Sequence, residues 1–307
     1  MKRLARTLIL LTLLLFPAIV PKYSAEPVKD AIYKAYTAVV EAYSAGGDVE
    51  ELIENLNRLI NSTQIDESEI YEISARLIEE AQKAKIEGEE KRRIELYYTI
   101  AWIVAAAGAV LVAYFYGGRL YWKIWLRLRG KYKVIVRRVP AERKSMLLSD
   151  EVKAVALAVV VVVLVFAISQ AYLAGRVVEP FSELGLLGSK MKIGDYPTEL
   201  VVGEKARLYV YVGNHMGYPM YYIVQVKIGN STTPIDPAPL EPVKTFERVL
   251  PHNATWIFPL EISFNETGLN YRIIVELWIY NYSSGRVEYH KRWCQLWVNV
   301  TSLLPPG

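Results

Sequence analysis

Two uncharged apolar runs, separated by a strongly basic segment, limit what this chain can fold into. The runs are residues 96–116 and 154–174, each 21 residues long. As helices rising 1.5 Å per residue, each would span roughly 30 Å, which is the hydrocarbon thickness of a bilayer. The sequence therefore predicts a membrane protein with two transmembrane helices, at 96–116 and 154–174, and the lipid bilayer as a partner.

The charges are distributed unevenly on the two sides of these runs. Residues 118–153 hold 11 Lys and Arg against 3 Asp and Glu, whereas residues 22–95 hold 10 against 17 and residues 176–307 hold 12 of each. Loops rich in Lys and Arg stay on the cytoplasmic side of a membrane. The expected localisation is the cell membrane, with a basic cytoplasmic loop at 117–153 and both terminal domains outside. The basic character predicts topology and headgroup contact, with no nucleic-acid partner.

Residues 1–25 have the pattern of a signal peptide. Lys2, Arg3 and Arg6 precede a 13-residue apolar stretch at 8–20, and a cleavage site ending at Ala25 would follow. An uncleaved signal anchor is the open alternative. Either form would deliver the chain from Glu26 onward to the outside.

Residues 26–95 are predicted to form an extracytoplasmic helical domain. Apolar residues recur at spacings of three and four, for example at Val28, Ile32 and Ala35, and turn residues interrupt the pattern at 46–48 and 61–66. This pattern indicates three short amphipathic helices in an antiparallel hairpin or bundle, with the third continuing past Gly88 into the first apolar run. The apolar faces are thin, so the bundle is expected to depend on a partner or on self-association.

The C-terminal region changes to an all-β pattern. After a linker at 175–195, residues 196–307 show period-two alternation between turn residues. The expected strands are 199–202, a strand beginning at Arg207, 222–228, 244–250, 256–262, 271–280 and 286–300. About seven short strands indicate an immunoglobulin-like sandwich. The single cysteine, Cys294, excludes a disulfide within the chain and is expected to be a buried strand residue.

Six Asn-x-Ser/Thr sequons agree with the predicted topology. One lies in the helical region and five lie in the sandwich, while the apolar runs and the basic loop contain none. The sequence thus predicts a glycoprotein, and which of the sequons would be modified stays open. The glycosylation candidates are Asn61, Asn230, Asn253, Asn265, Asn281 and Asn299.

Several short patterns in the C-terminal part resemble an archaeal family of membrane proteins, domain of unknown function 1616. The similar stretches are 180–188, 195–200, 202–204, 212–215, 222–226, 253–256 and 296–300. The resemblance covers about residues 176–300 and departs at Met216, where an acidic residue is expected. It implies a C-terminal extracellular β domain in an archaeal envelope and brings no activity. Asn214 and His215 are expected to stabilise a turn.

No pattern of catalytic, cofactor-binding or metal-ligating residues occurs. The sequence lacks a glycine-rich phosphate loop, a Gly-x-Ser-x-Gly elbow, a Cys-x-x-Cys pair and a His-Glu-x-x-His helix. His215, His252 and His290 lack the spacing of a zinc site, and no nucleophile has a neighbouring base. The expectation is a protein that is not an enzyme and needs no cofactor or metal.

The expected function is that of a noncatalytic, membrane-anchored cell-surface protein. Its sandwich would bind a protein or glycan partner, or serve as a structural envelope subunit. Tyrosines are candidates to line a binding face: Tyr218, Tyr221, Tyr222, Tyr280, Tyr282 and Tyr289. The alternative is an accessory subunit of a membrane enzyme or transporter, for example in surface glycan assembly or export.

Overall fold

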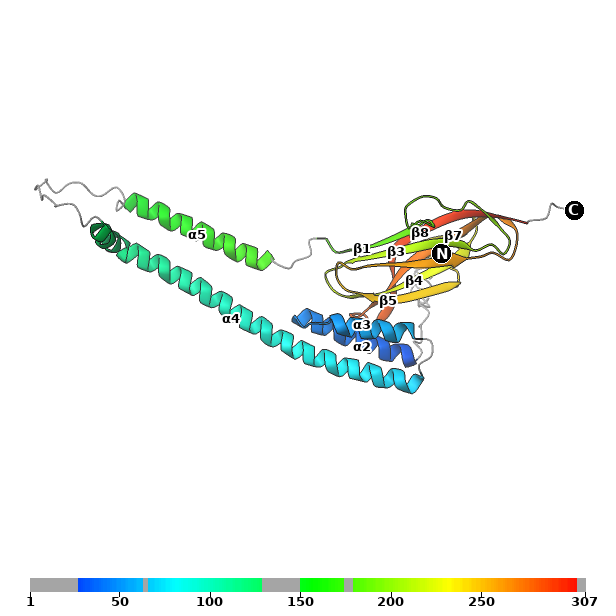
Figure 1. The fold of residues 1–307 in the computed structure, drawn as a ribbon, viewed down its shortest axis with the longest axis horizontal. Coiled ribbons are helices and arrows are strands. Elements are labelled where there is room, and N and C mark those ends of the chain that lie inside the picture. The colour runs from blue at the N-terminus through cyan, green and yellow to red at the C-terminus, as the bar shows by residue number, and fades with distance from the viewer. Residues whose placement is uncertain (1–26, 63–65, 129–149, 174–178, 303–307) are drawn as a thin grey trace, which may run out of the picture.

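A computed structural model describes residues 27–62, 66–128, 150–173 and 179–302. The predicted signal peptide at 1–25 lies outside the described residues, and so does most of the predicted basic loop. Four helices and eight strands are described (Figure 1). The helices come first along the chain, and the strands follow.

Helices α2, α3 and the start of α4 occupy the region where three amphipathic helices were predicted. Helix α2 is Pro27–Ala45, α3 is Glu50–Asn61, and α4 begins at Glu67. Gly46 ends α2 in a left-handed conformation, with φ of 91°, which glycine adopts without steric cost. The Asp66 carboxylate accepts a hydrogen bond from the Glu67 N–H at 2.9 Å and so caps α4.

Helix α4 continues into the first apolar run, as the sequence pattern predicts, and extends beyond the predicted end of that run at Tyr116. It is one helix, Glu67–Leu128, of 62 residues, or about 93 Å at 1.5 Å per residue. The helix passes without a break through the predicted domain boundary at 95 and 96, which confirms that continuation. The predicted end of that run is also not a helix end. Gly117 and Gly118 each weaken a helix by about 1 kcal/mol, but no proline follows to stop it.

The apolar part of α4 and the helix α5, Asp150–Leu173, expose many large side chains to the surroundings. Trp102 is 75% exposed and Val162 is 67% exposed. Over the described residues, no helix meets the combined length and hydropathy requirements of a membrane-spanning segment.

The C-terminal region is a β-sandwich of a three-stranded and a five-stranded sheet. The first sheet has the order β1-β3-β6 and the second β2-β8-β7-β4-β5. The strands are β1 Phe181–Leu187, β2 Glu199–Val201, β3 Ala206–His215, β4 Met220–Gly229, β5 Lys244–Leu250, β6 Thr255–Ile262, β7 Gly268–Asn281 and β8 Arg286–Thr301. All neighbours pair antiparallel except β2 and β8. All seven predicted strands are present, with ends that differ by a few residues.

The eighth strand, β1, lies in the segment that was predicted to be a linker. It pairs along its whole length with β3, from Phe181 opposite His215 to Leu187 opposite Tyr209. Leu186 is the only apolar residue of this strand that is deeply buried, and the other buried residue is Ser182. The apolar alternation is therefore short, and the β character of the strand is hard to recognise in the sequence. Strand β1 is thus an edge strand of the three-stranded sheet.

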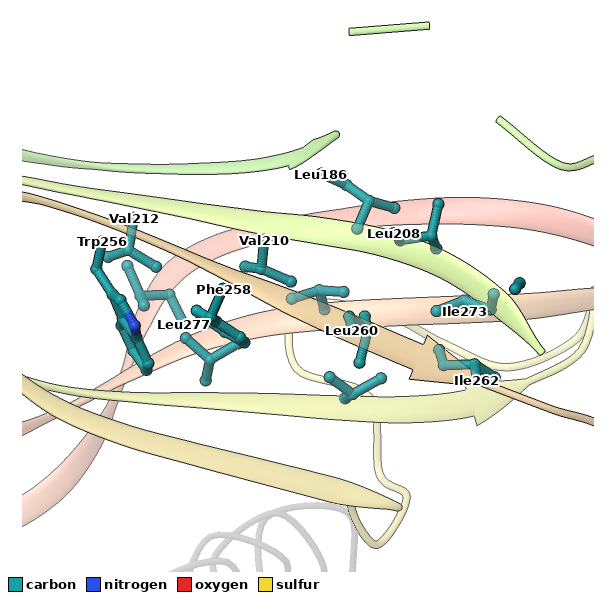
Figure 2. Packing of buried hydrophobic residues seen from close by; sticks show 14 of the residues in the cluster. Leu186, Leu208, Val210, Val212, Trp256, Phe258, Leu260, Ile262, Ile273 and Leu277 are labelled. Carbon is teal, nitrogen blue, oxygen red and sulfur yellow. The ribbon is translucent and has the colours of Figure 1, made fainter. Parts of the chain in front are cut away.

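The core of the sandwich consists of the inward-facing residues of both sheets (Figure 2). Val210 and Leu260 on one sheet and Ile273 and Leu277 on the other are all fully buried. Burying one such side chain stabilises the fold by about 1.5–3 kcal/mol. Buried and exposed residues alternate in β3 and β6, and this period explains why these strands could be found from the sequence.

The helices pack against the outside of the five-stranded sheet, as Figure 1 shows. One continuous buried cluster contains residues of α2, α3 and α4 together with Tyr221, Ile223 and Val249 of the sheet. The thin apolar faces of the helices therefore find their partner within the same chain. Helices and sandwich form a three-layer unit, from which the rest of α4 extends (Figure 1).

Candidate functional site

The six tyrosines predicted as a binding face do not form one open surface. Tyr218 packs edge-on against Tyr282 at 5.7 Å, and Tyr289 packs against Trp278 at 5.3 Å. Tyr221 and Tyr280 face the helices, where the ring of Tyr33 stacks on Tyr280 at 4.0 Å and meets Tyr221 edge-on at 5.3 Å. Burial raises the pKa of Tyr221, and the phenol donates a hydrogen bond to Glu247 Oε2 at 2.6 Å. This part of the expected face is covered by the chain's own helix α2 and does not remain open for another partner.

Tyr222 points to the opposite side and belongs to a buried polar cluster between the sheets. Its hydroxyl lies 2.6 Å from Ser182 Oγ and donates to Asn214 Oδ1 at 3.3 Å. The Nε2 atom of His290 lies 2.9 Å from the same Ser182 oxygen. A serine thus has a neighbouring base, a pair that sequence reasoning missed because 108 positions separate the two residues.

This serine–histidine pair does not have the properties of a hydrolase site. Ser182 is only 3% exposed, so a substrate has no access to its oxygen. Burial, and secondarily the charge of Arg292, lowers the pKa of His290, which keeps the imidazole neutral. The cluster joins β1 to the five-stranded sheet by hydrogen bonds. Its role is to hold the two sheets together.

Asn214 and His215 hold the loops at one end of the sandwich, which confirms their expected turn-stabilising role. The Asn214 amide nitrogen donates to the backbone oxygens of Tyr218, Leu250 and Pro251 at 2.8–3.0 Å. Its oxygen accepts from the Met216 N–H at 3.0 Å. The ring of His215 stacks on Phe181, with the centroids 4.7 Å apart.

A buried ion pair on the outer face of the five-stranded sheet was not predicted. Lys227 and Glu276 are 3% and 0% exposed, with Nζ and Oε2 at 2.8 Å. Both side chains also bond the backbone of Ala238, the lysine to its oxygen at 2.8 Å and the glutamate to its N–H at 2.6 Å. The pair therefore fixes the β4–β5 loop over the sheet. In the sequence, each residue looks like an ordinary polar strand position.

A family model, described as a domain of unknown function (DUF1616), matches residues 176–299. These residues include β1, Asn214 and nearly all of the sandwich described above. The C-terminal part of the chain therefore matches the DUF1616 family, and residues 176–299 are called the DUF1616 domain from here on. A comparison with curated proteins gave no match.

Solved structures similar to this chain include β-domains of other proteins. The CARDB domain of a Pyrococcus furiosus protein, solved with di-metal ions, has 17% identity and a TM-score of 0.29, covering 40% of this chain and 89% of that domain. A mutant beta-glucosidase from Listeria innocua has 17% identity and a TM-score of 0.29, covering 40% of this chain and 16% of its own. A beta-glucosidase from Erythrobacter marinus has 12% identity and a TM-score of 0.25, again covering 40% and 16%.

The described part of the chain contains no group of three or more His, Cys, Asp and Glu side chains that could hold a metal ion. Outside the DUF1616 domain, an open cleft of about 760 Å³ lies between α3 and α4. It is lined mainly by acidic side chains, among them Asp48, Glu51 and Glu87. Nothing else at this cleft points to a particular ligand.

The six predicted glycosylation sites differ in their exposure. Asn61, at the end of α3, is exposed, and so are Asn230, Asn253 and Asn265 in turns of the DUF1616 domain. Asn281 and Asn299 are half-buried. The amide nitrogen of Asn281, to which a glycan would be attached, donates to Glu288 at 3.0 Å.

Strand β8 carries the largest exposed aromatic side chains of the DUF1616 domain. Trp293 and Trp297 are 36% and 38% exposed. Both are on the outer face, because the alternating residues Cys294, Leu296 and Val298 pack against the core. Sequence reasoning included Trp297 only as part of the family pattern. The alternation in β8 is the signal that would have identified both.

Proposed function

We propose that this protein is a noncatalytic cell-surface protein, anchored in the membrane by two helices, that presents its DUF1616 domain to a partner outside the cell. The observation that carries the proposal is the continuity of α4. Its first part packs in the three-layer unit, and its second part is lined by exposed apolar side chains such as Leu96, Trp102 and Val104. Soluble proteins rarely expose so much contiguous apolar surface. A bilayer would cover it.

The uncharged runs at 96–116 and 154–174 support the same proposal, since each is long enough for the bilayer core. If the basic segment between the two runs lies in the cytoplasm, the chain before the first run and the chain after the second run both lie outside the cell. The three-layer unit would then lie at the outer membrane surface, joined to the anchor by an uninterrupted helix. The proposal includes an immunoglobulin-like character of the sandwich and an archaeal envelope as its setting, as the family resemblance implies.

Cysteine labelling in intact cells tests the topology. The native thiol is first removed by Cys294→Ala, and single cysteines are then introduced as Lys133→Cys in the basic segment and Glu266→Cys on an exposed turn of the sandwich. A membrane-impermeant maleimide is expected to label position 266 at once and position 133 only after permeabilisation. Labelling of position 133 in intact cells would overturn the layout.

The second candidate function is an accessory subunit of a membrane enzyme or transporter. It is favoured by the open space at Gly108 on α4, where an added Cβ meets nothing within 4 Å. Small residues in membrane helices allow close approach of another helix. Purification in detergent followed by mass spectrometry separates the two functions. A polytopic partner that stays bound after deletion of the sandwich supports the accessory subunit, and loss of all partners on that deletion supports the presenting protein.

A further inference from the structure

The outer face of the five-stranded sheet has a covered part and an open part. The helices cover β4, β5 and one end of β7, where Tyr221, Ile223 and Val249 are buried. Strand β8 packs against this buried cluster only near its start, at Val287, and its outward residues Trp293 and Trp297 remain more than one third exposed. Gln295 is exposed between them on the same face. These three residues are named here the tryptophan strip.

Contacts with Arg272 hold two members of the tryptophan strip, Gln295 and Trp297, in a fixed arrangement. The guanidinium of Arg272, on the neighbouring strand β7, lies 4.9 Å from the ring centroid of Trp297. Its Nε atom donates to Gln295 Oε1, and its Nη1 donates to the Thr233 oxygen at 2.9 Å. Arg272 itself is only 8% exposed. A buried cation thus orients both an indole ring and an amide, whose own N–H donors remain available for a ligand.

The tryptophan strip is also open on the side of β8 that faces away from β7. Beyond β8, the sheet continues only with β2, which pairs with residues Asn299–Thr301 and not with the segment that carries the tryptophans. Within the described residues, no strand borders Trp293 on that side. A long, flexible ligand can therefore lie along the strip and extend past both rings.

We propose that the tryptophan strip and Arg272 form a binding site for an oligosaccharide, an inference that rests on the proposed partner-binding role of the sandwich. An indole ring is flat and apolar with a polar edge, so it stacks on the C–H face of a sugar ring. The amide of Gln295 supplies hydrogen bonds to hydroxyl groups. The two tryptophans are four residues apart, about 13 Å along a strand. This length fits a chain of several sugars and not a monosaccharide.

The size of the strip argues against a protein partner. At 36% and 38% exposure, the two indoles offer roughly 90 Å² each, on the basis of about 250 Å² for a whole tryptophan side chain. A stable protein interface buries about 800 Å² on each partner. An oligosaccharide needs only a few stacked rings and fixed donors, which is what this part of β8 provides.

The experiment uses the full chain, produced without N-glycosylation and purified in a detergent without a sugar headgroup, because alkyl glycosides would compete. Isothermal titration calorimetry is carried out with cellohexaose, chitohexaose and an α-linked mannohexaose, and with the corresponding monosaccharides. At least one hexasaccharide is expected to bind, and the monosaccharides are expected to bind at least tenfold more weakly.

Four variants locate the site. Trp293→Ala and Trp297→Ala are each expected to weaken hexasaccharide binding at least tenfold, whereas Trp297→Phe keeps part of the stacking and weakens it less. Phe181→Ala is the matched control, because Phe181 is an aromatic residue of similar exposure, 43%, on the other sheet. It is expected to bind like the wild type. Circular dichroism of each variant verifies the fold.

Three results would overturn the proposal: no binding of any hexasaccharide, unchanged binding in both tryptophan-to-alanine variants, or a dimer of the full chain that Trp293→Ala dissociates in light scattering. The last result would assign the strip to a second copy of the chain. Failure here is distinguishable from failure of the proposed function. Labelling of position 133 in intact cells would overturn the topology and leave oligosaccharide binding unaffected.

Discussion

At the scale of single residues, the buried ion pair of Lys227 and Glu276 is the most demanding feature of this molecule. Removing two charges from water costs several kcal/mol per ion, so the pair is tolerated only with further hydrogen bonds. Here the Ala238 backbone and the Trp278 indole supply them, the latter donating to Glu276 at 3.2 Å. The pair thus attaches the β4–β5 loop to the sheet and fixes the position of Ala238.

Replacing one residue of this pair should destabilise the fold more than replacing both. Lys227→Met is expected to lower the free energy of unfolding by about 3–5 kcal/mol, because it leaves the Glu276 carboxylate buried without its counter-charge. The double variant Lys227→Met with Glu276→Leu should recover a large part of that loss. Urea titrations of the full chain in detergent measure the free energy of unfolding of the single and the double variant. Additive losses in the double variant would show that the two charges are not coupled.

His290 should make the stability of the sandwich depend on pH. Burial, and then Arg292, lowers the pKa of His290 in the folded chain, whereas the unfolded chain keeps the ordinary value near 6.5. Below about pH 6.5 the unfolded state therefore binds more protons than the folded state, and stability falls as the pH decreases. His290→Gln keeps a hydrogen-bonding group at Ser182 but does not titrate.

The measurement is thermal unfolding of wild type and His290→Gln between pH 8 and pH 5. The wild type should lose more stability than the variant over this range, so the difference between them shrinks or reverses at acid pH. Parallel curves for the two proteins would contradict the expected role of this histidine.

At the scale of elements, glycines decide how closely α2, α3 and α4 approach. Gly88, inside α4, lies directly against the turn between α2 and α3, and an added Cβ would be 2.6 Å from the Gly46 carbonyl carbon. The contact is with backbone, which cannot move aside as a side chain would. A glycine in the middle of a helix costs about 1 kcal/mol, and this close packing offsets it.

Gly88→Ala is expected to destabilise the helical part by about 1–3 kcal/mol, since the methyl group must push the helices apart. Gly108→Ala, on the same helix but with nothing within 4 Å, is the matched control and should be neutral or stabilising by up to about 1 kcal/mol. Helix content by circular dichroism during thermal unfolding distinguishes the two. Equal effects would show that the turn adapts to the methyl group.

At the scale of the whole molecule, the helices and the sandwich complete each other. Strand β5 is an edge strand, and such edges invite pairing with other chains. Here α3 covers it: the Asn57 amide donates to the Val249 oxygen and accepts from the Val249 N–H, both at 2.8 Å. Lys29 of α2 adds an ion pair with Glu247 at 3.1 Å. The sandwich is therefore expected to need the helices for its solubility as well as its stability.

Asn57→Ala tests this coupling. Val249 is fully buried, so the variant leaves its backbone N–H and oxygen without partners, at about 1–3 kcal/mol for an unsatisfied group. The unfolding transitions of helices and sandwich, followed by circular dichroism and tryptophan fluorescence, should shift together to lower temperature. Asn55→Ala on the same helix is the control and should change stability by less than about 0.5 kcal/mol. Separate transitions in the wild type would contradict a single cooperative unit.

The sequence by itself determined most of the secondary structure, apart from β1 and the end of α4, and the order of the parts. Strands such as β3 and β6 alternate because one side of each faces the core, and Leu208, Val210 and Val212 carry that period directly. The helices could be located for the same reason, and the breaks at Gly46 and Asp66 follow from backbone freedom and capping. These signals are local, so no knowledge of the fold is needed to read them.

Only the tertiary structure decided which surfaces are covered. The tyrosines looked like a free binding face, but α2 packs on Tyr221 and Tyr280, while the tryptophans of β8 stay open. Lys227 and Glu276, Ser182 and His290, and Asn57 and Val249 are brought together from 49 to 192 positions apart. Burial and pairing at such distances depend on how the layers stack, and no local pattern in the chain records that.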